Sequence, residues 1–102
     1  MVWFHCIDIA PGVEIHRLWG DPNNRSGALL RYAAGSKIQR HRHEGTENIY
    51  VLIGAQRDER GEYAAGAHVV NPPGSEHTVS SPKGCVVFVV WDRPNTFIDE
   101  TR

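Results

Sequence analysis

The sequence has no excess of either charge and no long apolar segment. Its 11 lysines and arginines nearly balance its 12 aspartates and glutamates, which leaves a formal net charge of −1. Binding of nucleic acid or of an anionic membrane through bulk charge is therefore not expected. No run approaches the roughly 20 apolar residues that a membrane span needs. The N-terminus has no basic start and Asp8 interrupts its apolar residues, so we expect no signal peptide.

Cysteine is scarce as well, with only Cys6 and Cys85 among 102 residues. Two cysteines do not make the disulfide framework of a small secreted domain, so we expect a cytoplasmic protein with reduced thiols. A bridge between Cys6 and Cys85 stays open as an alternative. The length suits one domain, which we place over residues 1–102, and there is no internal repeat, linker or low-complexity segment.

A helical period of 3.6 residues is absent, whereas glycine and proline interrupt the chain about every ten residues. This rhythm predicts an all-β, single-domain antiparallel barrel or sandwich. Strands are predicted at residues 13–19, 28–33, 38–43, 47–57, 66–70, 77–80, 85–91 and 97–98, with a hairpin turn at 58–61. The apolar run at 85–91 is typical of a central strand that is buried on both faces.

Two histidines and a nearby carboxylate form the strongest chemical pattern, inside the glycine-bracketed segment at residues 35–54. Side chains at positions i and i+2 of a strand point to the same face, so His41 and His43 project together. A three-residue turn then puts Glu47 at the start of the next strand, where it can face the same side. His77, placed by the turn at residues 72–74, is the candidate third imidazole from another strand.

The same parity predicts which side chains surround such a site. Ile49, Val51 and Ile53 follow Glu47 on its face and would form the apolar wall of a pocket. Residues 48, 50 and 52 should face away. Gln39 shares the parity of the histidines, so it either lines the pocket and hydrogen-bonds a ligand or faces solvent at the barrel mouth.

Three imidazoles and one carboxylate suit one divalent transition metal per chain, and ligand type does not choose among iron, zinc, manganese, nickel, copper and cobalt. With four protein ligands, an octahedral ion would keep two adjacent positions for water, dioxygen or a substrate, as in reactive sites. The alternative is that His41 and His43 are surface histidines, which a His-x-His pair alone usually indicates. His5, His16 and His68 lack ligand spacing, and we interpret His68 as a surface or pocket-rim residue.

The spacing of these residues resembles the two signature motifs of the cupin superfamily. The motif at 35–54 contains Gly35, His41, His43, Glu47 and Gly54; the motif at 66–81 contains Gly66, Pro72, Gly74 and His77, with Ser81 where asparagine is usual. The resemblance implies a jelly-roll β-barrel, commonly a homodimer, whose interior holds a metal through His41, His43, Glu47 and His77. Some aromatic residues would then cover a subunit interface, from the set Trp3, Phe4, Trp19, Tyr50 and Trp91.

Within the superfamily, the stretches RHRHEGTENIYVLIG, DERGEY and PKGCVVFVVW look most like the ChrR-type cupin group. That group includes the C-terminal domain of ChrR anti-sigma factors and domains related to small-ketone dioxygenases such as acetylacetone-cleaving enzymes. The anti-sigma factors carry a separate N-terminal zinc domain, for which these residues leave no room, so a complete anti-sigma factor is not expected. The dioxygenases are generally described with three histidines at the metal, whereas this sequence adds Glu47.

The sequence thus supports two classes of function. The first is a metal-dependent small-molecule enzyme, such as an iron-dependent dioxygenase acting on a small ketone, diketone or phenolic compound, with no catalytic group beyond the metal ligands. The second is a non-catalytic, metal-containing sensor or ligand-binding domain related to the ChrR regulatory domain. A metal-dependent isomerase is a third alternative, but it needs a general base, for which the pattern offers few candidates. The expected partner is a small molecule in each case.

Overall fold

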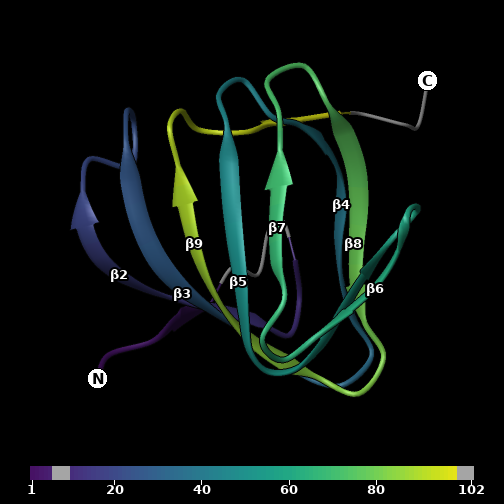
Figure 1. Cartoon of the computed structure of the whole chain (residues 1–102). Coiled ribbons are helices and arrows are strands. Elements are labelled where there is room, and N and C mark those ends of the chain that lie inside the picture. The colour runs from purple at the N-terminus through teal and green to yellow at the C-terminus, as the bar shows by residue number, and fades with distance from the viewer. Residues whose placement is uncertain (6–9, 99–102) are drawn as a thin grey trace.

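Ten β-strands and no helix form the part of the chain that the structure, a computed structural model, describes: residues 1–5 and 10–98 (Figure 1). The strands are β1 (Phe4–His5), β2 (Val13–Gly20), β3 (Ser26–Tyr32), β4 (Ser36–Arg42), β5 (Glu47–Asp58), β6 (Gly61–Ala64), β7 (His68–Asn71), β8 (Glu76–Ser81), β9 (Cys85–Trp91) and β10 (Thr96–Phe97). The all-β prediction is confirmed, and only the short strands β1 and β6 were not predicted. Within the described residues, no helix could cross a membrane.

The strands form one antiparallel sheet that curls into a half-barrel (Figure 1). Their order is β1-β2-β3-β9-β5-β8-β4-β10, and β6 and β7 pair with β5 outside this path. One wall contains β2, β3, β9, β7 and the first part of β5. The other contains β10, β4, β8, β6 and the last part of β5. This is the predicted jelly-roll architecture.

Strand β5 belongs to both walls because it bends at Gly54. Its residues 47–54 pair with β9, and its residues 55–58 pair with β6. Gly54 has a φ of +76°, which favours glycine, and a Cβ there would lie 2.3 Å from the carbonyl oxygen of Gly84. A β-bulge between Val51 and Ile53 precedes the bend and changes which side chains face inward. Gln56 is consequently buried, whereas Ile53 is 65% exposed.

Alternate side chains of the strands fill the core between the two walls. Strand β9 lies between β3 and β5, as predicted for a central strand, and its residues Cys85, Val87 and Val89 are buried. The intervening residues are only half-buried, so the prediction of burial on both faces is wrong. The reason is that an antiparallel sheet can leave its outer face to solvent. Cys85 carries a free thiol, and Cys6, its suggested partner, lies outside the described residues.

Candidate metal centre

Four buried side chains meet on the inner face of the barrel, where β4, β8 and the first residue of β5 come together. They are the predicted ligands His41, His43, Glu47 and His77, called here the ligand cluster. One potential ligand atom from each lies within 4.8 Å of all the others. Their exposed fractions are 3%, 0%, 4% and 4%. The fold therefore assembles residues up to 36 positions apart into one site.

The backbone explains this convergence. His41 is the register partner of His77 across the β4–β8 ladder, so the two imidazoles leave neighbouring strands side by side. His43 lies just beyond the end of β4, and its N–H donates to the carbonyl oxygen of Ser75 at 2.9 Å. Its own carbonyl oxygen accepts from the N–H of Gly74 at 2.8 Å. The turn at 72–74, which leads into the strand of His77, therefore also holds His43.

Hydrogen bonds around His41 and His77 determine which ring nitrogen carries the proton. Nδ1 of His41 lies 2.9 Å from the carbonyl oxygen of Gln39, which can only accept, so Nδ1 is the donor. Nδ1 of His77 donates to Oδ2 of Asp58 over 3.0 Å. In the neutral rings, both Nε2 atoms therefore carry lone pairs, and they face each other 3.0 Å apart.

His43 has the same tautomer for a related reason. The hydroxyl of Ser75 donates to the carbonyl oxygen of Pro72 at 2.6 Å, so Oγ accepts from Nδ1 of His43 at 2.9 Å. Nε2 of His43 is buried without a hydrogen-bond partner among the described residues, although Oε1 of Glu47 lies 3.1 Å away. A neutral imidazole nitrogen and a carboxylate oxygen are both acceptors, so no donor within residues 1–5 and 10–98 satisfies this contact.

The ligand cluster thus directs three nitrogen lone pairs and a carboxylate oxygen into one small volume. Such groups repel one another unless a proton or a cation lies between them, and neutral imidazoles with a carboxylate are a common donor set for divalent transition metals. The other ring nitrogen of each histidine is occupied by an acceptor, as is usual for histidines that bind metals. The residues present therefore fit one divalent transition-metal ion, whose identity the donor set does not choose.

Burial and neighbouring charges favour the metal-binding protonation states. Burial lowers the pKa of His41 and of His77, although the hydrogen bonds to Gln39 and Asp58 oppose this shift. Burial alone would raise the pKa of Glu47, but the contact with His43 and the charge of the imidazoles, when protonated, lower it to about 2. His41 and His77 are thus available as neutral ligands and Glu47 as a carboxylate.

Three further side chains orient Glu47. Its Oε2 accepts from the indole Nε1 of Trp91 at 2.6 Å and from Nδ2 of Asn95 at 3.3 Å. Its Oε1, the oxygen near His43, accepts from Nδ2 of Asn71 at 3.0 Å. Trp91, which the sequence placed among candidates for a subunit surface, is instead half-buried at the carboxylate ligand.

A cavity of about 220 Å³ lies beside the ligand cluster. His41, Glu47 and His77 form one polar part of its lining, and most of the remaining lining is apolar. Gln56 and Tyr32 form a second polar part and are joined by a hydrogen bond of 3.2 Å. The cavity therefore combines an apolar interior with potential metal ligands on one side.

The pocket residues predicted from the alternation of side chains along the strands differ from those that line the observed cavity. Ile49 lines the cavity, Val51 belongs to the buried core, and Ile53 lies on the outer surface beyond the bulge in β5. Gln39 is exposed, and Ile38 lines the cavity instead, because a second bulge between Ile38 and His41 shifts β4. Of the two alternatives for Gln39, its exposure agrees with the solvent-facing one. The assignment of Ile53 to the pocket is wrong, because the bulge in β5 breaks the strict alternation of side chains that the prediction assumed.

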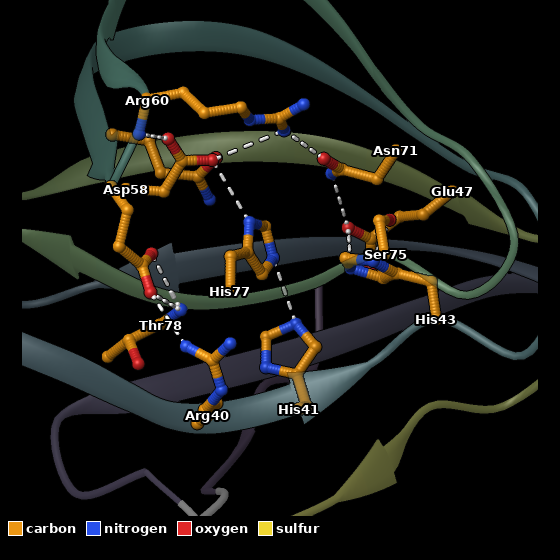
Figure 2. A network of polar contacts seen from close by, with 12 residues as sticks. Arg40, His41, His43, Glu47, Asp58, Arg60, Asn71, Ser75, His77 and Thr78 are labelled. Atoms are coloured by element: carbon orange, nitrogen blue, oxygen red, sulfur yellow. Dashed lines mark hydrogen bonds and ion pairs between the residues drawn. The ribbon is translucent and has the colours of Figure 1, made fainter.

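The sequence did not indicate the side chains that hydrogen-bond to the ligand cluster and orient it, which are Asp58, Asn71, Ser75 and Trp91. Figure 2 shows the first three of them around the histidines and Glu47. For Asp58 the sequence alone indicates only a place in the hairpin turn at residues 58–61. The one available signal was the presence of polar residues on both sides of the 72–74 turn in the second motif. Their contacts depend on elements that are distant in sequence.

The sequence matches the family described as the ChrR cupin-like domain over residues 2–93. The chain belongs to this cupin family. The matched region contains both motifs and the whole ligand cluster, so the resemblance inferred from the sequence is confirmed. No curated protein sequence matches this cupin.

Solved structures with the same fold include proteins of several kinds. An acetylacetone dioxygenase from Acinetobacter johnsonii has a TM-score of 0.88 at 18% identity, over 96% of this cupin and 72% of that chain. A chain in the Rhodobacter sphaeroides SigE–anti-sigma ChrR complex has a TM-score of 0.78 at 26% identity, over 90% of this cupin and 49% of that chain. The polyketide cyclase RemF from Streptomyces resistomycificus has a TM-score of 0.76 at 18% identity, over 100% of this cupin and 88% of that chain. The likeness to the dioxygenase and the cyclase shows the fold alone.

Proposed function

We propose that this cupin binds one divalent transition-metal ion in the ligand cluster and uses it to hold and activate a small organic molecule in the adjacent cavity. The observation that carries the proposal is the convergence of three histidines, each protonated at Nδ1, and Glu47 at the wall of a largely apolar cavity. His41, Glu47 and His77 border the cavity directly, so a molecule inside it lies next to the metal-binding groups.

The lining of the cavity supports a substrate class. Aliphatic side chains such as Leu30, Ile49 and Val89 face it, which favours a small and largely apolar compound. The polar ligand cluster would receive the oxygen atoms of that compound, while the surrounding strands exclude bulk water. Bound iron supplies Lewis acidity and reactivity toward dioxygen. We therefore propose an iron-dependent dioxygenase that acts on a small ketone, diketone or phenolic compound.

A second candidate is a non-catalytic sensor or ligand-binding domain. It is supported by membership of the ChrR cupin-like family and by the likeness to the SigE–ChrR complex. In this alternative the same cluster holds a metal whose environment changes when a ligand or an oxidant arrives, and nothing is turned over. The two candidates share the metal site and differ in whether dioxygen is consumed.

Metal analysis tests the shared part of both candidates. We expect the purified protein to contain a stoichiometric transition metal, and the double variant His41→Ala/His77→Ala to lack it. His68→Ala, which removes an exposed histidine, is the matched control and should retain the metal. A double variant that still holds a stoichiometric ion would show that the ligands are wrong.

Oxygen uptake separates the enzyme from the sensor. The iron-loaded protein is supplied with a panel of β-diketones and phenols in an oxygen electrode, and products are analysed by mass spectrometry. Oxygen consumption that matches product formation supports the dioxygenase. Bound iron without uptake across the panel excludes an oxygenase for these compounds and supports the sensor.

We also propose a homodimer formed through the outer face of β5, β7 and β9. Tyr50, Leu52 and Val70 are 38%, 50% and 49% exposed although their side chains are largely apolar. The ring of Tyr50 stacks on His68 with centroids 4.3 Å apart and lies 5.8 Å from the ring of Phe88. Contiguous apolar surfaces are often interaction sites. A second copy of the chain is the occupant that we propose for this face.

A further inference from the structure

The two ends of β5 both reach the ligand cluster. Glu47 is the first residue of the strand and belongs to the cluster. Asp58 is the last residue and contacts Nδ1 of His77, the ring nitrogen that does not face the cluster. The bend at Gly54 makes this possible, because a straight strand would separate residues 11 positions apart by about 36 Å. The side chain of Asp58 is only 4% exposed, so its carboxylate is held inside the protein next to a metal-binding imidazole.

A chain of polar contacts joins these two ends outside the cluster (Figure 2). Nη2 of Arg60 donates to Oδ2 of Asp58 over 3.4 Å and also to Oδ1 of Asn71. Nδ2 of Asn71 then donates to Oε1 of Glu47 over 3.0 Å. Because the guanidinium can only donate, it fixes the amide of Asn71 with its NH₂ group toward Glu47. The contacts therefore run without interruption from His77 through Asp58, Arg60 and Asn71 to Glu47.

A purely structural role in the hairpin would not need this arrangement. The neighbouring ion pair of the same hairpin, Arg57 with Glu62, has its atoms 3.2 Å apart and both side chains 53% exposed. Burial of a carboxylate is costly unless it is paired and hydrogen-bonded, and Asp58 uses Oδ2 for His77 as well as Arg60. Oδ1 of Asp58 accepts the backbone N–H of Arg60 at 2.9 Å, which holds the carboxylate in place.

The geometry points to Asp58, Arg60 and Asn71 as positioning residues that connect two ligands of the metal site and set its affinity and electron density. Asp58 directs a negative charge at His77, which increases electron donation by that imidazole to a metal. Arg60 offsets part of this charge and carries the contact to Asn71, which aims Oε1 of Glu47. The inference rests on the metal-binding part of the proposed function and is independent of the reaction.

Cobalt(II) affinity of metal-free protein tests the role of Asp58. We expect Asp58→Asn to weaken binding about 10–100-fold, as is typical when an outer-shell partner of a ligand is removed. Glu62→Gln makes the same change of charge in the same hairpin without touching the ligands, so its affinity should stay within about twofold. Asn71→Leu, which removes the donor to Glu47 at similar volume, should weaken binding about tenfold and serves as a second arm if Asp58→Asn does not fold.

The midpoint potential of the iron-loaded protein distinguishes a charge effect from a packing effect. Loss of the negative charge in Asp58→Asn favours the ferrous state and should raise the potential, whereas loss of the positive charge in Arg60→Met should lower it. Arg60→Lys keeps the charge and should restore the parent value, and Arg57→Met should leave it unchanged. Loosened packing alone would not produce shifts of opposite sign.

Several results would overturn the inference. Parent-like cobalt affinity in both Asp58→Asn and Asn71→Leu would remove its basis, and so would shifts of potential in the same direction for Asp58→Asn and Arg60→Met. Circular dichroism of each metal-free variant shows whether a loss reflects unfolding. A parent protein that binds no cobalt would instead reject the proposed metal site, so failure of the inference and failure of the proposed function are distinguishable.

Discussion

The indole N–H of Trp91 donates to Oε2 of Glu47 over 2.6 Å and joins the last residue of β9 to the first residue of β5. The two residues are also register partners in the sheet. Asn95 donates to the same oxygen, so Oε1 is the oxygen of Glu47 that faces His43. The strand ladder thus places a tryptophan where it orients the carboxylate of a candidate metal ligand.

Replacement of Trp91 by phenylalanine tests this orientation because it removes the donor and keeps most of the ring. Hydrogen bonds to charged groups contribute about 1.5–3 kcal/mol to stability. We therefore expect the free energy of unfolding of the metal-free variant to be lower than that of the parent by a similar amount. Cobalt affinity should fall about tenfold. Urea unfolding and cobalt titration measure the two effects. Trp19→Phe, at a tryptophan that is 43% exposed, is the control, and equal losses in both variants would contradict the assignment.

The metal-free protein should lose stability in acid. The pKa of His41 and of His77 is lowered from 6.5, so below that pH the unfolded chain binds more protons than the native one. The pKa of Glu47 is lowered from 4.5 to about 2, so its contribution is present above 4.5 and is lost as the pH falls toward 2. Both effects have the same sign: stability rises with pH across this range.

Urea unfolding between pH 7.5 and about pH 2.5 measures this dependence, and His41→Phe should flatten the part just below pH 6.5. Because the histidines must be deprotonated to bind a metal, the bound ion should also dissociate over the same range. A protein that retains its metal at about pH 4 would argue against histidine ligands.

Gly54→Ala should destabilise the bend that returns β5 to the site. Its φ is +76° and the added Cβ would meet the carbonyl oxygen of Gly84 at 2.3 Å. Gly66 also has a positive φ, +95°, but a Cβ there meets nothing within 4 Å, so Gly66→Ala reports the backbone strain alone. We expect a loss of about 1 kcal/mol for Gly66→Ala and a clearly larger one for Gly54→Ala. Thermal unfolding of both variants provides the comparison, and equal losses would show that the close approach at Gly54 is unimportant.

Leu52→Glu should convert the proposed homodimer into a monomer, since it places a charge in the apolar outer face of β5. Light scattering coupled to gel filtration gives the mass of each species. Lys37→Glu changes the charge on the opposite wall, on β4, and should leave the dimer intact. A parent protein that is monomeric at micromolar concentration would reject the proposed interface.

Much of the fold and of the ligand cluster could be predicted from the sequence. The glycine and proline rhythm marked the strand boundaries, and the i, i+2 rule placed His41 and His43 on one face. The cupin motifs added His77 from another strand. Parity failed at Ile53, because a β-bulge depends on pairing with a neighbouring strand and leaves little local signal. The alternation rule assumes an uninterrupted ladder, so it holds along the regular parts of a strand and fails beyond a bulge.

The sequence by itself determined the all-β class, the two motifs and the identity of the four candidate ligands, since these depend on residue types and short spacings. Only the tertiary structure decided which nitrogen of each histidine faces the site, because the tautomers follow from partners such as Gln39 and Asp58. It also decided that Asp58 and Trp91 support the site. Both residues reach it through the bend of β5 and the β5–β9 ladder, and such contacts between distant segments exist only once the sheet has folded into the half-barrel.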